Sequence, residues 1–148
     1  MTRGQTTPEQ WLIVSTPLER KALLRLRRGS GVLVLGKLQP AEGRYLRHIA
    51  RSRGLVVAAL APKTAVRVHS LEELRLTLLR RTPLVILSPL YPTLSHPDWE
   101  PFTRMRAAAL ARLANRKLTA LGGMNERRFR RIQRLGFVAW AGISAFRT

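Results

Sequence analysis

Short apolar runs alternate along the chain with longer segments in which apolar and charged residues are mixed. The runs lack a strict polar alternation, which is typical of strands buried on both faces of a parallel sheet. The segments between them have the length and mixed character of amphipathic helices. This order predicts a parallel sheet with right-handed helical crossovers. The runs occupy residues 11–15, 31–36, 55–61, 65–70, 83–89, 118–123 and 137–146.

The mixed segments carry helix start and stop signals. Pro40 predicts the first residue of a helix and Gly54 its end. Residues 16–19 and 70–73 each have the pattern of a capping box, and Asn125 is a further N-cap candidate. The sequence therefore predicts helices over residues 18–28, 40–53, 71–81, 103–115 and 126–135.

Two ways of closing the sheet fit this order. An open doubly wound sheet needs a glycine-rich phosphate turn after an early strand, and neither "VSTPLE" nor "GKLQPAEG" matches one. In a β/α barrel the functional residues gather at the C-terminal ends of the strands. Polar and glycine-rich residues do so here, at 88–96, 122–123 and 142–144. We therefore predict an α/β protein with a TIM-type (β/α) barrel, shortened to about seven β/α units, in one domain over residues 1–148 with a loose segment at 1–10.

The sequence excludes several kinds of site. It has no cysteine, so disulfides, thiolate metal sites and a cysteine nucleophile are absent. The longest apolar runs are too short to span a bilayer, and "MTRGQTTPEQ" lacks the apolar core of a signal peptide. We expect a cytoplasmic protein without membrane association. The oligomeric state stays open, a homodimer included.

The charge brings in a second class of partner. Lysine and arginine total 27 against 8 acidic residues, a net charge of +19. Such a field attracts phosphates and nucleic acid. The arginines are spread over every predicted helix without a recognised nucleic-acid motif, which is also the pattern of a solvated outer face. A basic nucleic-acid-binding protein is therefore the alternative to a barrel that binds a metabolite.

Three segments of the C-terminal half share a specific resemblance. "VILSPLYPTLSHP", "LTALGGMNERRFRRIQRLGF" and "VAWAGISAF" resemble, in order and spacing, the C-terminal half of the thiamine phosphate synthase/TenI family. In that family one strand ends in a proline- and threonine-containing loop, the next in a glycine pair and the last in a small-residue turn. "RVHSLEEL" resembles the unit before them, so the match extends from Val66 to Phe146.

The resemblance implies a transferase that joins a hydroxymethylpyrimidine diphosphate to a thiazole phosphate, whereas TenI relatives tautomerise the thiazole. It places residues of the 88–101 loop on the diphosphate or pyrimidine side, with His96 as the candidate catalytic residue. It places the glycine pair and the last turn on the thiazole phosphate. By position, the implied phosphate- and substrate-binding residues are Lys37, Thr93, Ser95, His96, Gly122, Gly123, Ile143 and Ser144.

The N-terminal half departs from the family. After the second strand only Lys37 remains of a diphosphate-gripping segment, and "ALAPKTAV" passes directly to "RVHS", as though one helix and one strand were deleted. The family uses magnesium to bridge the diphosphate, which requires carboxylates. Asp98 is the only aspartate of the chain. We therefore expect no metal site and no cofactor.

These departures leave the activity open. The sequence favours a degenerate barrel with a retained phosphate pocket, and a thiazole tautomerase-like protein or a non-catalytic phosphometabolite-binding relative are further alternatives. The TenI histidine falls at Pro89 here. Proline fixes φ, so the four prolines of residues 88–101 predict a stiff loop that projects Thr93, Ser95 and His96 over the barrel mouth. We also expect Trp140 to face the barrel core, and His69 to be hydrogen-bonded at the end of its strand.

Overall fold

The computed structural model describes residues 7–94 and 96–147. Its strands form a single parallel sheet in the order β3-β2-β1-β7-β6-β5-β4. The strands are β1 (Gln10–Val14), β2 (Gly31–Val34), β3 (Val56–Ala59), β4 (Ala65–Val68), β5 (Leu84–Leu87), β6 (Leu118–Ala120) and β7 (Phe137–Gly142). The helices are α1 (Arg20–Leu24), α2 (Pro40–Arg53), α3 (Leu71–Leu79), α4 (Arg104–Leu113) and α5 (Glu126–Ile132), with short 3-10 helices η1 (Gln133–Leu135) and η2 (Ser144–Phe146).

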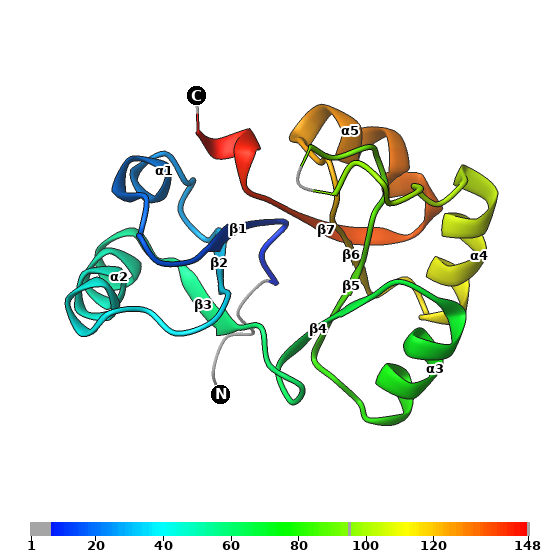
Figure 1. Cartoon of the computed structure of the whole chain (residues 1–148), viewed down its shortest axis with the longest axis horizontal. Helices are drawn as coiled ribbons and strands as arrows, with labels where there is room; N and C mark the ends of the chain where they lie inside the picture. The colour runs from blue at the N-terminus through cyan, green and yellow to red at the C-terminus, as the bar shows by residue number, and fades with distance from the viewer. Residues whose placement is uncertain (1–6, 95, 148) are drawn as a thin grey trace.

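The sheet curls into a half-barrel and does not close. In Figure 1 the helices stand outside it, α1 and α2 beside β1–β3, and α3, α4 and α5 around β4–β7. Strands β3 and β4 are the two edges of the sheet. The seven parallel strands predicted from the sequence are confirmed, but the closed TIM-type barrel of seven β/α units is wrong. Residues 60–64 join β3 to β4 without a helix, and a barrel that lacks one strand of eight retains a gap there.

Alternate residues of the strands enter two apolar layers, as the pleat of a strand requires. The layer inside the half-barrel is the smaller one and consists of Trp11, Ile13, Leu33, Ala65, Ile86, Ala139 and Ala141. The layer between sheet and helices is larger and includes Leu12, Val14, Val32, Val68, Val85 and Leu87. The outer face of β3 is the exception, because no helix follows that strand: Val57 is 43% exposed.

Trp140 lies on the opposite side of the sheet from the one predicted. Phe137 faces the helices, and strict alternation from there would turn Trp140 inward. The pairing of β6 with β7 shifts by one residue, so that Thr119 lies opposite Ala139. A one-residue shift turns every later side chain to the other face. Trp140 therefore packs on the helix side, where its ring stacks on Phe146 with centroids 5.1 Å apart.

The predicted helix signals at α2, α3 and α5 are confirmed. Pro40 is the first residue of α2, and Gly54 ends it in the left-handed region with φ 64°. The Ser70 hydroxyl accepts a hydrogen bond from the N–H of Glu73. The Asn125 side chain accepts one from the N–H of Arg128 at 2.8 Å.

The capping box predicted at residues 16–19 is wrong. Helix α1 begins at Arg20, and the Glu19 side chain makes no capping hydrogen bond. The Thr16 hydroxyl instead donates to the Glu42 carboxylate at 2.7 Å, and the N–H of Leu18 donates to the same group. Glu42 thus ties the loop after β1 to the first turn of α2. A tertiary contact has replaced the local one.

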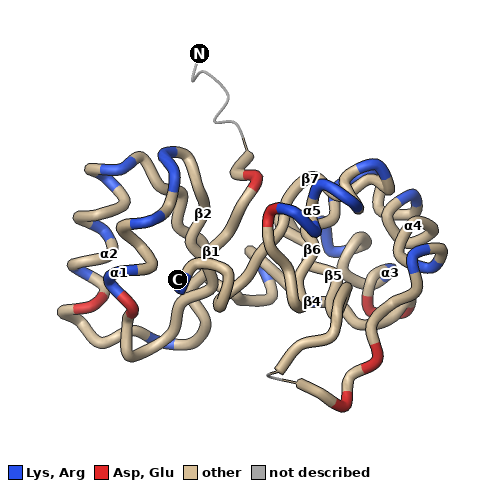
Figure 2. Tube along the Cα trace, turned by 90° about the horizontal axis from the view of Figure 1, so that it is seen from above, with Lys and Arg blue, Asp and Glu red and all other residues tan. Residues whose placement is uncertain are grey.

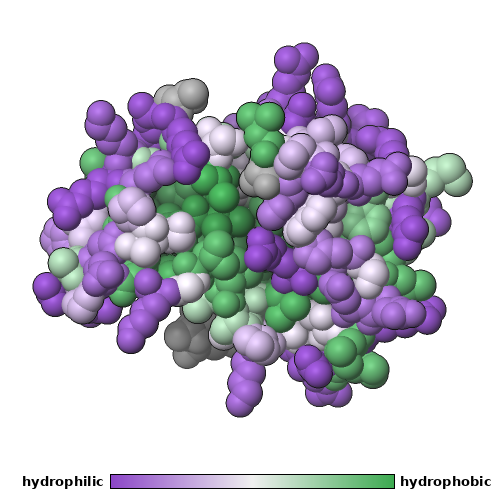
Figure 3. All heavy atoms as spheres, viewed as in Figure 1, coloured by the Kyte–Doolittle hydropathy of each residue, from purple (hydrophilic) through white to green (hydrophobic). Residues whose placement is uncertain are grey.

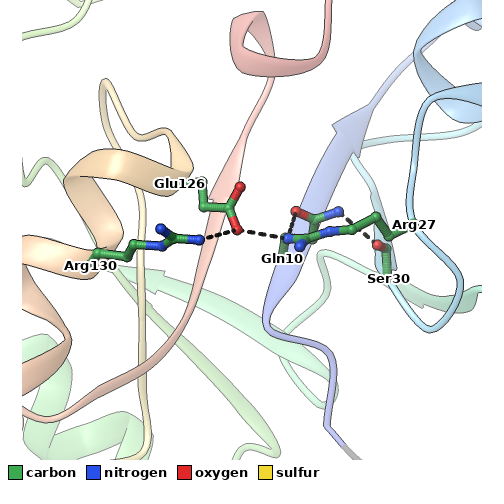
Figure 4. Close-up of polar contacts among 5 residues, drawn as sticks. All are labelled: Gln10, Arg27, Ser30, Glu126 and Arg130. Carbon is green, nitrogen blue, oxygen red and sulfur yellow. Dashed lines mark hydrogen bonds and ion pairs between the residues drawn. The ribbon is translucent and has the colours of Figure 1, made fainter.

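A polar network joins the two halves of the sheet at the start of β1 (Figure 4). The buried Gln10 amide donates to the Ser30 hydroxyl at 2.8 Å and accepts from Arg27 at 2.9 Å. Arg27 also pairs with Glu126 at 3.1 Å, and Glu126 pairs with Arg130. The network links α1 to α5 across β1 and β7.

The start of the chain is packed from residue 8 on. Of the segment expected to be loose, residues 1–6 lie outside the described part. The carbonyl of Glu9 accepts a hydrogen bond from the N–H of Trp140, and Gln10 begins β1. Within the described residues no helix is long and apolar enough to cross a membrane.

Candidate ligand-binding site

The residues that follow the strands meet at one end of the half-barrel, because all strands are parallel. We call this end the mouth. Figure 3 shows it as an apolar floor between two lobes with hydrophilic rims. Leu35 after β2 and Ile143 after β7 are both 39% exposed. They line a small pocket of about 90 Å³ with residues of β1 and α1.

The glycine pair after β6 supports the loop after β5. The N–H of Leu90 donates to the carbonyl of Leu121 at 3.0 Å, and the N–H of Tyr91 donates to that of Gly122 at 3.1 Å. A Cβ atom on Gly122 would lie 2.7 Å from the Cα of Pro89, and one on Gly123 would lie 2.5 Å from the carbonyl oxygen of Pro92. Both glycines also have positive φ, at 103° and 58°. Loop packing alone therefore requires glycine at both positions.

Arg128 adds a cation beside this glycine pair. Its guanidinium donates to the carbonyl of Gly123 and lies 4.7 Å from the centre of the Tyr91 ring. The sequence reading treated Arg128 as one of several cations on an outer helix face and missed this position. The signal was present, because an N-cap at Asn125 puts Arg128 in the first turn of the helix, at the mouth end.

The last turn of the chain lies next to the glycine pair. A Cβ atom on Gly142 would be 3.5 Å from the carbonyl oxygen of Met124, so the end of β7 lies against the loop after β6. Ile143 and Ser144 follow, both exposed, and Ser144 begins η2. The contact places Gly142, directly before residues 143–144, beside Met124, directly after the glycine pair.

A second group of residues lies at the ends of β4 and β5. His69 Nδ1 is 2.8 Å from the carbonyl oxygen of Ser88. A carbonyl can only accept, so Nδ1 carries the proton, and in the neutral ring Nε2 keeps its lone pair. The prediction that His69 is hydrogen-bonded at its strand end is confirmed. This bond fixes the orientation of the ring, and Nε2 is free to act as an acceptor or base.

Trp99 packs between the two histidines of this region. Its ring stacks on His96 with centroids 3.9 Å apart and meets His69 edge-on at 4.9 Å. These contacts show that Trp99 packs the loop after β5 against the end of β4. Beside it is an open groove of about 720 Å³, lined by His69, Pro89, Asp98, Trp99, Glu100, Pro101, Phe102, Thr103 and Arg106.

The remaining predicted residues are distributed around the rim. Lys37 is exposed in the loop after β2 and makes no ion pair within the described residues. Thr93 is half-buried in the loop after β5, and Ser95 lies outside the described residues. His96 is exposed at the end of that loop, stacked on Trp99. The seven described residues of the predicted set thus come from four segments, which follow β2, β5, β6 and β7.

Acidic side chains are numerous around the mouth, but they do not form a metal site within the described residues. The Thr16 hydroxyl, followed by the backbone N–H groups of Gln39 and Leu18, lowers the pKa of Glu42. Glu19 pairs with Arg147 at 2.7 Å. Within residues 7–94 and 96–147 no three His, Asp or Glu side chains lie close enough to hold a metal ion. This set of donors does not fit a magnesium-bridged diphosphate.

The fold is that of thiamine phosphate pyrophosphorylases. The chain is similar to the thiamine phosphate pyrophosphorylase from Pyrococcus furiosus, with a TM-score of 0.71 and 16% identity over 95% of this chain and 88% of that one. The enzyme from Bacteroides thetaiotaomicron gives 0.51 and 17% identity over 92% and 83% of the two chains. A native KDPGal structure gives 0.53 and 10% over 94% and 84%.

The sequence comparisons do not assign the chain to a family. No protein-family model matches the chain, and no curated protein does. At this level of identity the structural neighbours establish a shared fold, and a fold supports many functions. The chain is thus an α/β half-barrel with the fold of thiamine phosphate pyrophosphorylases.

Proposed function

We propose that this half-barrel is a degenerate relative of thiamine phosphate synthase that binds a phosphorylated thiazole-type ligand at its mouth. The observation that supports the proposal is the contact between Gly142 and the carbonyl of Met124, because these two residues directly adjoin residues 143–144 and 122–123. The fold shared with thiamine phosphate pyrophosphorylases supports the same assignment.

The chemistry of these strand ends suits a phosphate attached to an apolar ring. The exposed Ser144 hydroxyl can donate to a phosphate oxygen, and charge-assisted hydrogen bonds of this kind are about twice as strong as neutral ones. Arg128 contributes a half-buried cation within reach of the glycine pair. Exposed Leu35 and Ile143 offer an apolar surface for a ring.

The magnesium-dependent condensation of a pyrimidine diphosphate is not part of this proposal. Asp98 and Glu100 are exposed on the loop after β5 and belong to no group of three His, Asp or Glu side chains among the described residues that could hold a metal ion. Among the described histidines, His69 has the geometry of a base, since its Nδ1 is anchored to the Ser88 carbonyl. A surviving proton transfer would therefore use His69 Nε2 more readily than the predicted His96.

Calorimetry with hydroxyethylthiazole phosphate tests the proposal. Binding to the parent protein is expected, and Ser144→Ala should weaken it at least about tenfold, the effect of one lost hydrogen bond to a charged group. Ser52→Ala is the matched control, because Ser52 lies in the last turn of α2 and bonds only to Ile49. No binding by the parent, or equal binding by Ser144→Ala and the parent, would rule out the assigned site.

Lys37 provides a second arm of the same experiment. If Lys37 still contacts a diphosphate, Lys37→Gln should weaken the binding of inorganic diphosphate, while Lys63→Gln in the β3–β4 link should not. Gly123→Ala is not a suitable test of ligand binding. Its added methyl group would press on the Pro92 carbonyl and disturb the loop even without a ligand.

A further inference from the structure

The end of the half-barrel opposite the mouth collects cations from every helix. Helices that return antiparallel to parallel strands all finish at the same end of the sheet, and their last turns lead into the α1–β2, α2–β3, α3–β5, α4–β6 and η1–β7 turns. We call this end the basic face. Its exposed cations that form no ion pair within the described residues are Arg25, Arg28, Arg51, Arg80, Arg81, Arg112, Arg116, Lys117, Arg131 and Arg134.

Most of the charge of the basic face is not neutralised by the protein, although Arg27 and Arg130 at the same end pair with Glu126. Within residues 7–94 and 96–147 none of the ten side chains enters an ion pair. Apart from Glu126 and from Glu9 at the beginning of β1, the acids lie at the other helix starts and in the loop after β5. Figure 2 shows the separation: most red segments lie along the lower border, and blue segments run over the upper part of both lobes.

Neighbouring turns of this face are joined to one another. The N–H of Gly29 donates to the carbonyl of Gly54 at 3.0 Å, and the Arg28 side chain lies over Gly54. The Arg116 side chain lies in the same way over Gly136. These contacts connect α1–β2 with α2–β3 and α4–β6 with η1–β7. The cations of these four turns therefore sit on two connected platforms, while Arg80 and Arg81 lie in the separate α3–β5 turn.

Two arginines occupy backbone positions that favour glycine. The turns after α1, α2 and η1 use Gly29, Gly54 and Gly136 at positive φ. The turns after α3 and α4 place Arg81 and Arg116 at positive φ, 55° and 59°. A side chain in the left-handed region strains the backbone. Unfavourable residues that persist in a fold are found where function needs them, and here both add charge to the same face.

We propose that the basic face binds double-stranded nucleic acid through its phosphates, without reading sequence. Arginine matches phosphate geometry with a planar set of donors. Single strands are held by stacking on aromatic side chains. The five turns that carry the basic face contain no tryptophan, tyrosine or phenylalanine. A surface that contacts phosphates but offers no aromatic ring for base stacking suits a duplex, whether of DNA or of RNA.

Fluorescence anisotropy with short duplexes of DNA and RNA over a salt titration tests this proposal. The face variant combines Arg80→Gln, Arg81→Gly, Arg116→Gly and Lys117→Gln. A control variant of equal net charge removes cations from the early and middle turns of the helices: Lys21→Gln, Arg44→Gln, Arg47→Gln and Arg75→Gln. Near about 100 mM salt the face variant should bind at least about tenfold more weakly, and the control less than about threefold.

The dependence on salt gives a second readout. Each phosphate contact contributes about 0.9 to the slope of log affinity against log salt concentration, so the face variant should lose about 2 to 4 units of slope and the control less than 1. Equal losses in the two variants, or no binding of duplex by the parent, would overturn the proposal. Preference for a single strand, or binding to phosphatidylserine vesicles but not to duplex, would overturn it as well.

Failure of this experiment is distinguishable from failure at the mouth. The four substituted positions lie at the opposite end from Ser144 and Lys37, so binding of hydroxyethylthiazole phosphate should be unchanged in the face variant. Retained thermal stability of the variant separates a lost contact from unfolding, because glycine is the residue that the backbone of positions 81 and 116 favours.

Discussion

The two ends of the half-barrel differ in charge and in how they could bind a partner. The mouth has an apolar floor and mixed charge, with Lys37, Arg106 and Arg128 beside acidic helix starts, whereas the opposite end has ten exposed cations without ion pairs among the described residues. Both follow from one topology. Acids favour helix N-termini and cations favour helix C-termini, and the parallel sheet places all starts at one end and all ends at the other.

The comparison teaches that one fold can separate two kinds of recognition. At the mouth a ligand would depend on a few groups in fixed positions, such as Ser144 and the backbone beside Gly123. At the basic face a partner would depend on many weak and interchangeable contacts. Single substitutions should therefore be informative at the mouth, while the basic face should respond only to several substitutions together.

The largest effect is expected at the loop platform of the mouth. Gly122→Ala combines positive φ with a contact of 2.7 Å to the Cα of Pro89. The backbone strain costs about 1 to 2 kcal/mol, and the overpacking about 1 to 3 kcal/mol. Urea unfolding should show a loss of about 2 to 5 kcal/mol in the free energy of unfolding.

Gly36→Ala is the matched control for this prediction. Gly36 has φ 74°, and an added Cβ would meet no atom within 4 Å. Only the strain of about 1 to 2 kcal/mol remains there. Equal losses for the two substitutions would mean that the loop after β5 does not rest on the glycine pair.

The second-largest effect concerns the free energy of unfolding, which should change in opposite directions for substitutions at two turns of the basic face. Arg116→Gly removes a side chain from the left-handed region and should raise the free energy of unfolding by about 0.5 to 1 kcal/mol. Gly54→Ala introduces one at φ 64° and should lower it by about 1 to 2 kcal/mol. Thermal melting of both variants gives the comparison. A loss of stability in Arg116→Gly would show that this arginine serves the fold, not a partner.

A smaller difference is expected within the network of Figure 4. Arg27→Gln removes the donor of the buried Gln10 carbonyl as well as an ion pair, and should cost about 1 kcal/mol. Arg130→Gln removes only an exposed pair within α5 and should cost less than about 0.5 kcal/mol. Denaturant titrations of the two variants should keep this order. The reverse order would mean that the link between the two halves does not run through Gln10.

The smallest effect is expected at Glu42, and it depends on pH. The lowered pKa of its carboxyl means that the folded state favours the charged form, through Thr16 first and then the N–H groups of Gln39 and Leu18. This contribution is present above the ordinary glutamate pKa of 4.5 and is lost as the pH falls through the lowered value. Glu42→Gln should therefore melt below the parent at neutral pH, and the gap should narrow under acid conditions. A gap that stays constant with pH would contradict the role of the charge.

The local pattern was sufficient to predict the order of strands and helices. The apolar runs matched strands in number and position, since burial on both faces leaves an uninterrupted apolar signal. The helix boundaries at Pro40, Gly54 and Asn125 also matched, because caps are set by residues within one turn. The sequence also predicted that no helix separates Ala61 from Ala65, because the apolar runs 55–61 and 65–70 follow each other almost directly.

Long-range contacts decided the rest, and they leave little trace in a local pattern. The shift between β6 and β7 turned Trp140 to the helix side, and the reach of Glu42 to Thr16 replaced a capping box. The stacking of Trp99 on His96 and the place of Arg128 beside Gly123 likewise join residues of different elements. The sequence by itself determined which segments are strands and helices, because those preferences act between residues a few positions apart. Only the tertiary structure decided that the sheet stays open between β3 and β4 and that the cations of five helices share one end, because both depend on how distant segments pack.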